Sequence, residues 1–463
     1  MPEKFLRRVE LPLSAEQALA WHERPGAFER LLPPWENVQV VDRQGTIRSG
    51  DRTRIRLSLA GMKLHWLAEH YDYQPDRQFA DRQLSGPFAE WNHVHRFLPA
   101  EPGGCVLEDD IAYRVPGGWL GKLLGGAIAR GSLERMFTYR HRTVQDDMNA
   151  HAKFAEREPL TIAITGASGL VGSALAPLLT TGGHRVVALS RAASKTKQPS
   201  VAESGRWDPA TGEIESSAGD ALDAVVHLAG ENIAGARWNA RRKQAIRDSR
   251  VGTTQRLCES LARRATKPSV LICASATGYY GSRGDDLLTE ESVAGVGFLP
   301  EVCREWEAAT QPAVEAGIRV VNVRLGIILS PKGGALAKML TPFRLGAGGV
   351  VGSGKQYWSW IALDDVIGAM HHCLLTDSIH GPVNATAPNP VTNREFTKTL
   401  GQVLHRPTIV PLPAFAARLA LGEMADDLLL SSSKVMPSRL IETGYAFRFP
   451  QLEGALRHLL GAT

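Results

Sequence analysis

The sequence predicts an α/β protein in which a parallel sheet with helices on both faces follows an α+β domain and precedes a small helix-rich segment. Three observations predict this class. From Leu160 to about residue 402, apolar strands alternate with helical stretches, the sequence form of a parallel βαβ sheet. Before Pro159, stretches with a period of two dominate and are typical of antiparallel strands. A glycine-rich turn joins the first strand of the central part to its first helix.

The composition is that of a soluble protein with several domains. The 463 residues include 53 lysines and arginines and 48 aspartates and glutamates, which leaves a net charge of +5. That charge is too dilute for the basic stripe of a nucleic-acid-binding protein. No run approaches the roughly 18 apolar residues of a membrane span, and the five cysteines are widely spaced. We therefore expect a cytoplasmic protein with reduced thiols, no nucleic-acid partner and no membrane span.

The first domain is expected at residues 1–156. Its alternating stretches predict strands joined by polar turns, and a long amphipathic helix should follow the turn at Pro116-Gly117-Gly118. An antiparallel sheet that wraps one long helix is the simplest arrangement of these elements. The predicted strands are residues 5–11, 38–42, 53–60, 63–73, 90–98 and 105–115, and the predicted helical stretches are residues 14–32 and 119–151.

Two histidines of this domain alternate on one strand. His93 and His95 would point to the same face of the sheet, an arrangement that suits two metal ligands. No third ligand follows at a spacing typical of metal sites. The sequence therefore predicts no metal site.

The central domain, expected at residues 157–402, opens with a strand that runs into a Gly-x-x-Gly-x-x-Gly turn. Gly166 would permit the tight turn, Gly169 would let the backbone approach a pyrophosphate, and Gly172 would let the next helix pack on the strand. A second strand at residues 185–190 completes the unit, which predicts a dinucleotide site. The expected cofactor contacts of the turn are Gly166, Ala167, Ser168, Gly169, Leu170, Val171 and Gly172.

The end of the second strand indicates which dinucleotide binds. An acidic residue there would accept hydrogen bonds from the ribose 2′-hydroxyl of NAD. This chain has Ser190 and Arg191 instead, and a guanidinium suits the 2′-phosphate of NADP(H). Lys195 and Lys197 follow and could assist. We therefore expect NADP(H) as the cofactor.

Two further buried strands of the central domain end in small and hydroxyl-bearing residues. In open parallel sheets the carboxyl ends of the strands face the ligand crevice, so these ends should meet the cofactor. The expected contacts are Leu228, Ala229, Gly230, Ala274 and Ser275. The last segment, residues 403–463, is expected to form a small domain that completes the substrate side.

Several of these segments resemble known families. TGASGLVG, VVHLAG and ATGYYG stand in the order found in extended short-chain dehydrogenase/reductases, which have a Rossmann fold. LAGENIAGARW, GFLPEVCREWEAA and YWSWIALDD resemble the atypical subgroup called epimerase family proteins, which are similar to nucleoside-diphosphate-sugar epimerases. The first domain resembles the SRPBCC (START-like) helix-grip superfamily. That resemblance implies a cavity between sheet and helix that binds an apolar ligand.

The resemblance also implies a catalytic set that this chain lacks. Ordinary short-chain dehydrogenases use a Tyr-x-x-x-Lys pair and a Ser or Thr. Leu299 and Cys303 stand at the positions of the pair, and Ala276 stands at that of the hydroxyl residue. Cys303 is expected to be buried, which disfavours an activated thiol in their place.

Other residues at the same strand ends are candidates for the chemistry. Tyr280, Tyr279 and Ser275 would lie where substrate meets the nicotinamide, and each is a candidate for proton transfer. Packing in the core is the competing interpretation of these aromatic residues. The residues expected to line the substrate site are Glu231, Asn232, Trp238, Arg250, Thr277 and Trp358.

Two functions follow as hypotheses. In the first, the chain is an NADP-dependent oxidoreductase or epimerase-like enzyme acting on a hydroxyl or carbonyl of a small, nucleotide-sugar-like or apolar molecule. In the second, it is a non-catalytic, NADPH-responsive binding or regulatory protein whose first domain holds an apolar ligand. The substrate and the oligomeric state stay open.

Overall fold

The computed structural model describes residues 2–59, 62–191, 201, 203–215 and 222–462. Lys195 and Lys197 lie outside the described residues. The chain divides into two compact units, one of Met1–Glu158 with Thr180–Gly183 and Thr463, and one of Pro159–Leu179 with His184–Ala462. Each unit is described by itself below. None of the helices in the described part of the chain has the length and apolar character needed to traverse a bilayer.

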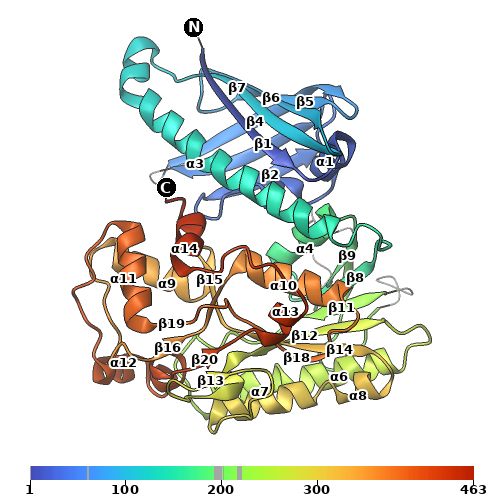
Figure 1. The fold of residues 1–463 in the computed structure, drawn as a ribbon, viewed down its shortest axis with the longest axis vertical. Coiled ribbons are helices and arrows are strands. Elements are labelled where there is room, and N and C mark those ends of the chain that lie inside the picture. Colours follow the sequence, from blue (N-terminus) through green and yellow to red (C-terminus); the bar gives the residue numbers. More distant parts are fainter. Residues whose placement is uncertain (1, 60–61, 192–200, 202, 216–221, 463) are drawn as a thin grey trace. The chain divides into compact units, whose positions relative to one another are not determined.

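The first unit contains an antiparallel seven-stranded sheet with the order β1-β7-β6-β5-β4-β3-β2. The long helix α3 packs along β1 within this unit (Figure 1). The predicted sheet around one long helix is therefore confirmed. The strands are β1 (Glu3–Leu11), β2 (Val38–Gln44), β3 (Arg52–Leu59), β4 (Met62–Gln74), β5 (Gln78–Ser85), β6 (Glu90–Ala100) and β7 (Gly104–Arg114), and the helices are α1 (Ala15–Glu23), α2 (Ala27–Arg30) and α3 (Gly118–Ala152).

Two elements of this unit differ from the sequence prediction. The helical stretch at residues 14–32 is two helices, because Pro25 and the left-handed Gly26 separate α1 from α2. Strand β5 was not predicted. Its sequence, QFADRQLS, is polar and contains few residues that favour strands.

The interior of the first unit contains a polar group of side chains beside its apolar core. Strands β5, β6 and β7 place four side chains on one face of the sheet, and α3 adds a fifth. We call Asp81, His93, His95, Asp109 and His141 the imidazole cluster. His93, Asp109 and His141 are buried and His95 is 8% exposed. Asp81 reaches the two histidines from the neighbouring strand, where spacing along the sequence did not reveal it, and the absence of a metal site stays a prediction.

The second unit contains a parallel seven-stranded sheet with the order β10-β9-β8-β11-β12-β14-β18. Chain order reverses between β8 and β11, as in a doubly wound Rossmann sheet. Helices α6, α7 and α8 lie on one side of the sheet in Figure 1 and α4 and α10 on the other. The predicted fold class is confirmed. The strands are β8 (Thr161–Thr165), β9 (Arg185–Ser190), β10 (Glu203–Arg206), β11 (Ala224–His227), β12 (Val270–Ala276), β14 (Arg319–Leu325) and β18 (Gly381–Ala385).

The helices of this unit bury both faces of the sheet. Leu257 and Leu261 of α6 pack against Val225 of β11 and Leu271 of β12 in one core cluster. The helices named here are α4 (Gly172–Thr181), α5 (Ala240–Asp248), α6 (Val251–Ala262), α7 (Phe298–Ala308), α8 (Gln311–Glu315) and α10 (Leu363–Leu375), and the short 3-10 helix η2 spans Thr277–Tyr280.

The C-terminal segment shares a core with the rest of the second unit. Leu452 and Leu456 of α14 (Leu452–Leu460) pack in one buried cluster with Trp360 of β17 (Trp360–Ala362) and Phe396 of α11 (Asn393–Leu404). The predicted division at residue 403 stays a prediction. The other elements of the unit that matter for the site are α9 (Gly334–Arg344), β16 (Tyr357–Trp358), β19 (Val391–Thr392) and α12 (Ala414–Leu421).

Candidate functional site

The glycine turn lies at the point where the strand order of the parallel sheet reverses. Gly166, directly after β8, has a φ of +71°, which favours glycine. A Cβ on Gly166 would lie 2.9 Å from the backbone carbon of Leu228, and one on Gly172 would lie 2.4 Å from the oxygen of Gly166. The turn after β8, the end of β11 and the start of α4 are therefore in direct backbone contact, which requires the glycines.

The outer part of the turn offers room and backbone donors for an anion. Ser168 and Gly169 are exposed, whereas Ala167 is buried. Leu170 and Val171 are partly buried at the start of α4. The first amides of a ten-residue helix carry partial positive charge, and no side chain at Gly169 blocks an approaching phosphate. These residues fit a dinucleotide pyrophosphate.

A buried hydroxyl and imidazole hold the adjoining strand end in place. Thr165 Oγ1 lies 2.7 Å from Nδ1 of His227 and accepts hydrogen bonds from the backbone amides of Leu228 and Ala229 at 3.2 and 3.3 Å. Nε2 of His227 lies 3.1 Å from the hydroxyl of Thr254. Burial lowers the pKa of His227 to about 4, so the ring is neutral and serves as a fixed hydrogen-bonding bridge. Sequence reasoning passed over this residue.

The end of β9 carries no carboxylate. Ser190 closes the strand and its carbonyl accepts a hydrogen bond from Trp207 N, while Arg191 is exposed. An exposed guanidinium at this strand end can bind a phosphate on the adenosine ribose. The cofactor prediction rests on these two positions together with the glycine turn.

The predicted catalytic serine is already engaged by protein groups. Ser275, at the end of β12, is buried, and its hydroxyl donates to Oε1 of Glu307 at 2.7 Å. Glu307 in turn forms a bidentate ion pair with Arg324, with Nε–Oε1 and Nη2–Oε2 distances of 2.8 Å. Ser275 therefore positions Glu307 instead of offering a free hydroxyl. Ala274, its neighbour on β12, is buried.

Tyr280 belongs to the same closed network. Its hydroxyl donates to Oδ1 of Asn384 at 2.7 Å and accepts from Nη1 of Arg324 at 2.8 Å. Burial raises the pKa of Tyr280 to about 12, despite the nearby guanidinium, so it is a poor acid or base near neutral pH. The prediction of Tyr280 as the proton donor is not supported by this geometry. We call Ser275, Tyr280, Glu307, Arg324 and Asn384 the arginine cluster.

Tyr279 differs from its neighbour. It is partly buried, and the guanidinium carbon of Arg324 lies 3.6 Å from the centroid of its ring. Among the described residues, its hydroxyl has no hydrogen-bond partner, so it can donate to a ligand. Of the three predicted catalytic side chains, Tyr279 is the one with an unengaged polar group.

Helix α7 packs where the resemblance places the standard catalytic pair. A Cβ on Gly278 in η2 would lie 3.4 Å from Cβ of Leu299 and 3.8 Å from Sγ of Cys303. Both residues are buried, and burial raises the pKa of the Cys303 thiol to about 12. The expected burial of Cys303 is confirmed, and a thiol with this pKa is not an activated nucleophile.

Four of the predicted substrate-lining residues lie together. Arg242 forms an ion pair of 2.7 Å with Glu231 and donates to the carbonyl of Asn232. Arg250 donates to the carbonyl of Glu231 at 3.0 Å. Trp238 packs edge-on against Phe298 of α7 at 5.1 Å and is half-buried. This group adjoins the exposed Gly230 at the end of β11.

Thr277 and Trp358 do not join this group. Thr277 donates to the carbonyl of Leu325, at the end of β14. Trp358 is 3% exposed, packs against Phe396 with tilted rings and belongs to the core around α11 and α14. The prediction that Trp358 lines the substrate site is therefore not supported, because the core encloses its ring.

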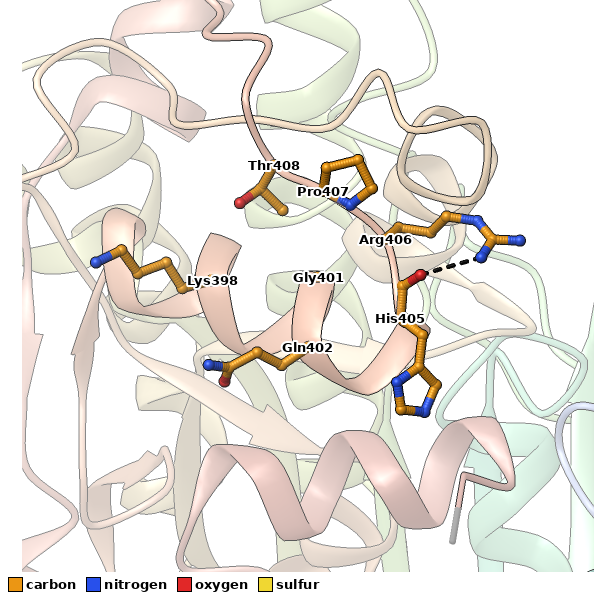
Figure 2. Close-up of a pocket in the computed structure, with 7 residues that line it drawn as sticks. All are labelled: Lys398, Gly401, Gln402, His405, Arg406, Pro407 and Thr408. Atoms are coloured by element: carbon orange, nitrogen blue, oxygen red, sulfur yellow. Dashed lines mark hydrogen bonds between the residues drawn. The ribbon is translucent and has the colours of Figure 1, made fainter.

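A surface hollow lies elsewhere on the second unit. Figure 2 shows it at the C-terminal end of α11, where a Cβ on Gly401 would lie 2.3 Å from Cγ2 of Thr408. None of its lining residues was predicted as part of a site. They are Lys398, Gly401, Gln402, His405, Arg406, Pro407 and Thr408.

Comparisons with known families agree with this organisation. Residues 162–384 match the NAD dependent epimerase/dehydratase family, and residues 11–137 match a family described as polyketide cyclase / dehydrase and lipid transport. Residues 412–459 match a domain of unknown function. The predicted resemblances to epimerase family proteins and to the SRPBCC-like superfamily are confirmed.

Relatives come from several kingdoms. An epimerase family protein of Mycobacterium bovis is 43% identical over 295 residues, which cover 64% of this chain and 96% of that protein. Human epimerase family protein SDR39U1 is 34% identical over 304 residues, which cover 65% of this chain and 100% of that protein. An Arabidopsis thaliana relative, 36% identical over 65% of this chain and 87% of its own, is named chloroplastic. The cytoplasmic location therefore stays a prediction.

Two solved structures share sequence as well as fold. The nucleoside-diphosphate sugar epimerase from Corynebacterium glutamicum superimposes with a TM-score of 0.79 at 35% identity, over 99% of this chain and 90% of that one. Human SDR39U1 (isoform 2), crystallised with NADPH, gives a TM-score of 0.59 at 34% identity, over 65% of this chain and 99% of that one.

Proposed function

This chain belongs to the NAD dependent epimerase/dehydratase family, and from that membership we propose that it binds NADP(H) and transfers hydride between this cofactor and a hydroxyl or carbonyl substrate. The observation that carries the proposal is the glycine turn Gly166–Gly172, which meets the end of β11 through backbone contacts that no other residue would allow. The NADPH bound by the human relative supports the choice of cofactor.

Different residues of this chain would bind different parts of the cofactor. The amides at the start of α4 would hold the pyrophosphate, and Arg191 would pair with the 2′-phosphate. When bound, the nicotinamide supplies the site that accepts or donates hydride. Tyr279 would carry the proton of the substrate oxygen at its hydroxyl, next to the positive charge of Arg324.

The cofactor assignment is tested by Arg191→Ala. Loss of a charge-assisted contact of about 1.5–3 kcal/mol should weaken NADPH binding about ten- to a hundredfold. Binding of NADH, which lacks the 2′-phosphate, should change little. Calorimetric titration of both dinucleotides measures the two affinities. Equal weakening of both would contradict the 2′-phosphate contact.

The catalytic assignment is tested with Tyr279→Phe. NADPH oxidation should first be followed with a panel of nucleotide-sugar and small apolar carbonyl compounds. For any substrate that reacts, Tyr279→Phe should lower kcat about a hundredfold or more, because a positioned proton donor contributes that much. NADPH affinity should stay unchanged. A variant with wild-type kcat would remove Tyr279 from the reaction.

A second function is favoured by the closed arginine cluster. Ser275 and Tyr280 are committed to protein partners, and Leu299 and Cys303 occupy the positions of the usual pair. These features also suit a non-catalytic protein that responds to NADPH occupancy. Tight NADPH binding without turnover over the whole carbonyl panel would favour this function over the first.

A further inference from the structure

The imidazole cluster brings side chains from three adjacent strands to one place. Asp81 of β5 pairs in register with His93 of β6, and His95 of β6 pairs with Asp109 of β7. Side chains two residues apart on a strand share a face, so all four point to the same side of the sheet. Burial of this many titratable groups is costly unless each finds a partner.

The separations around Asp81 are longer than hydrogen bonds. Its Oδ2 lies 3.3 Å from Nδ1 of His93 and 3.7 Å from Nε2 of His95. Ordinary N–H···O contacts are about 2.7–3.2 Å long. Bonds of about 2.0–2.2 Å to one ion would place neighbouring ligand atoms roughly 3–3.5 Å apart. One ligand atom from each of the three side chains lies within 4.8 Å of the others.

The opposite atoms of Asp81 and His93 are held by other groups. Nε2 of His93 lies 2.9 Å from Oδ1 of Asp109, and Trp91 Nε1 donates to Oδ1 of Asp81 at 3.1 Å. Nδ1 of His95 also lies 2.7 Å from Oδ1 of Asp109, but without the direction of a hydrogen bond. In His93, a proton held toward Asp109 leaves the nitrogen that faces Asp81 with a free lone pair. Carboxylates behind ligating imidazoles are the usual outer shell of protein metal sites.

The carboxylates of the cluster also attract cations. Asp81 and Asp109 bring two negative charges into the cluster, and the guanidinium of Arg140 interacts electrostatically with both. Within the described residues, the buried Nδ1 of His95 has no well-directed hydrogen-bond partner, so these protein groups leave the cluster incomplete. A divalent ion would pair directly with the carboxylate of Asp81. The side chain of Asp81 is 17% exposed, which gives the ion an approach from solvent.

We propose that Asp81, His93 and His95 bind a divalent transition-metal ion inside the first domain. Two imidazoles and one carboxylate suit ions such as Zn²⁺, Co²⁺ or Fe²⁺ and leave coordination positions for water or an oxygen of a ligand. This site is separate from the glycine turn, and the proposal does not depend on the proposed function.

The competing account is a proton in place of the metal. Although burial lowers it, the hydrogen bonds and charges of Asp109 and Asp81 raise the pKa of His93 to about 9. An imidazolium would then satisfy the two carboxylates, and a metal would have to displace its proton. Direct measurement of metal binding separates these two accounts.

The test uses the full chain, stripped with a chelator and titrated with Zn²⁺ or Co²⁺. The wild type should bind one equivalent, and X-ray absorption of the zinc-loaded protein should show imidazole and oxygen ligands. Asp81→Asn and His95→Gln should each weaken binding by more than the ten- to hundredfold typical of an outer-shell loss, and Trp91→Phe by about tenfold. His65→Ala, which removes an exposed histidine of β4, is the matched control.

Several results would overturn the proposal. One is a wild type that binds neither ion, and another is a zinc spectrum without imidazole ligation. A third is wild-type affinity in Asp81→Asn with its fold shown intact by circular dichroism. Because the absorption spectrum is recorded on the wild type, a variant that fails to fold does not remove the test. Arg191→Ala should bind the metal normally, which separates this outcome from that of the cofactor site.

Discussion

The imidazole cluster of the first unit and the arginine cluster of the second are both buried and polar, yet they are built differently. In the arginine cluster, a guanidinium meets a carboxylate in a bidentate pair, and the hydroxyls of Ser275 and Tyr280 fill the remaining sites. In the imidazole cluster, Asp81 stands 3.3 and 3.7 Å from its nearest imidazoles. A network in which every polar group has a hydrogen-bond partner stabilises the fold. A network whose polar atoms lie farther apart has room for a bound ion.

Arg324→Met should have the largest effect on stability. The arginine is 2% exposed, and its loss would leave the partly buried Glu307 without a counter-ion. We expect the free energy of unfolding to fall by about 3–5 kcal/mol. Urea denaturation followed by circular dichroism measures this change.

The matched control is Arg418→Met, which breaks the exposed pair with Asp426. Solvent screens that pair, so no measurable loss is expected. Similar stability of both variants would show that the arginine cluster is not the closed network described above.

His227 shares a feature with each cluster. It is a buried imidazole, as in the imidazole cluster, and protein hydroxyls satisfy its ring nitrogens, as they satisfy the polar groups of the arginine cluster. Its folded pKa of about 4 lies below the unfolded value of 6.5, so below pH 6.5 the unfolded chain binds a proton that the folded chain does not. Its contribution to stability is therefore lost as pH falls from 6.5 toward 4. Between about pH 7 and pH 5 the loss should be about 2 kcal/mol.

His227→Gln keeps a polar side chain and removes this titration. Unfolding curves of both proteins at the two pH values should show a smaller pH dependence in the variant. An unchanged pH dependence would mean that His227 does not stay neutral in the folded protein.

Among the changes at Arg324, His227 and Tyr280, Tyr280→Phe should have the smallest effect on the free energy of unfolding. It removes the hydroxyl that joins Asn384 to Arg324 and should cost about 1–2 kcal/mol of unfolding free energy. Tyr279→Phe removes a hydroxyl without a partner among the described residues and should cost less than about 0.5 kcal/mol. Thermal melts of the pair measure the difference. Equal losses would contradict the different roles assigned to the two tyrosines.

Local sequence signals were sufficient for the parallel sheet and its glycine turn. The strand before Gly166, the glycine spacing and the helix from Gly172 are all contiguous, so a pattern along the chain contains the whole unit. The same holds for Arg191, which directly follows a predicted strand.

The two polar clusters could not be predicted in this way. Arg324 and Asn384 sit on β14 and β18, more than thirty residues from Tyr280, and only the sheet brings them together. Asp81 was missed for a second reason, because β5 itself is polar and did not resemble a strand. Without that strand, His93 and His95 lacked a third neighbour.

The position of α14 bears on the order in which the chain can fold during synthesis. Leu452 and Leu456 close the core built by Trp360 and Phe396, so this core stays open until the last helix of the unit has left the ribosome. The antiparallel sheet of the first unit and its helix α3 are complete far earlier. The amino-terminal unit can therefore fold while the second is still being translated, and the unfinished second unit is the stage at which chaperones would be needed most.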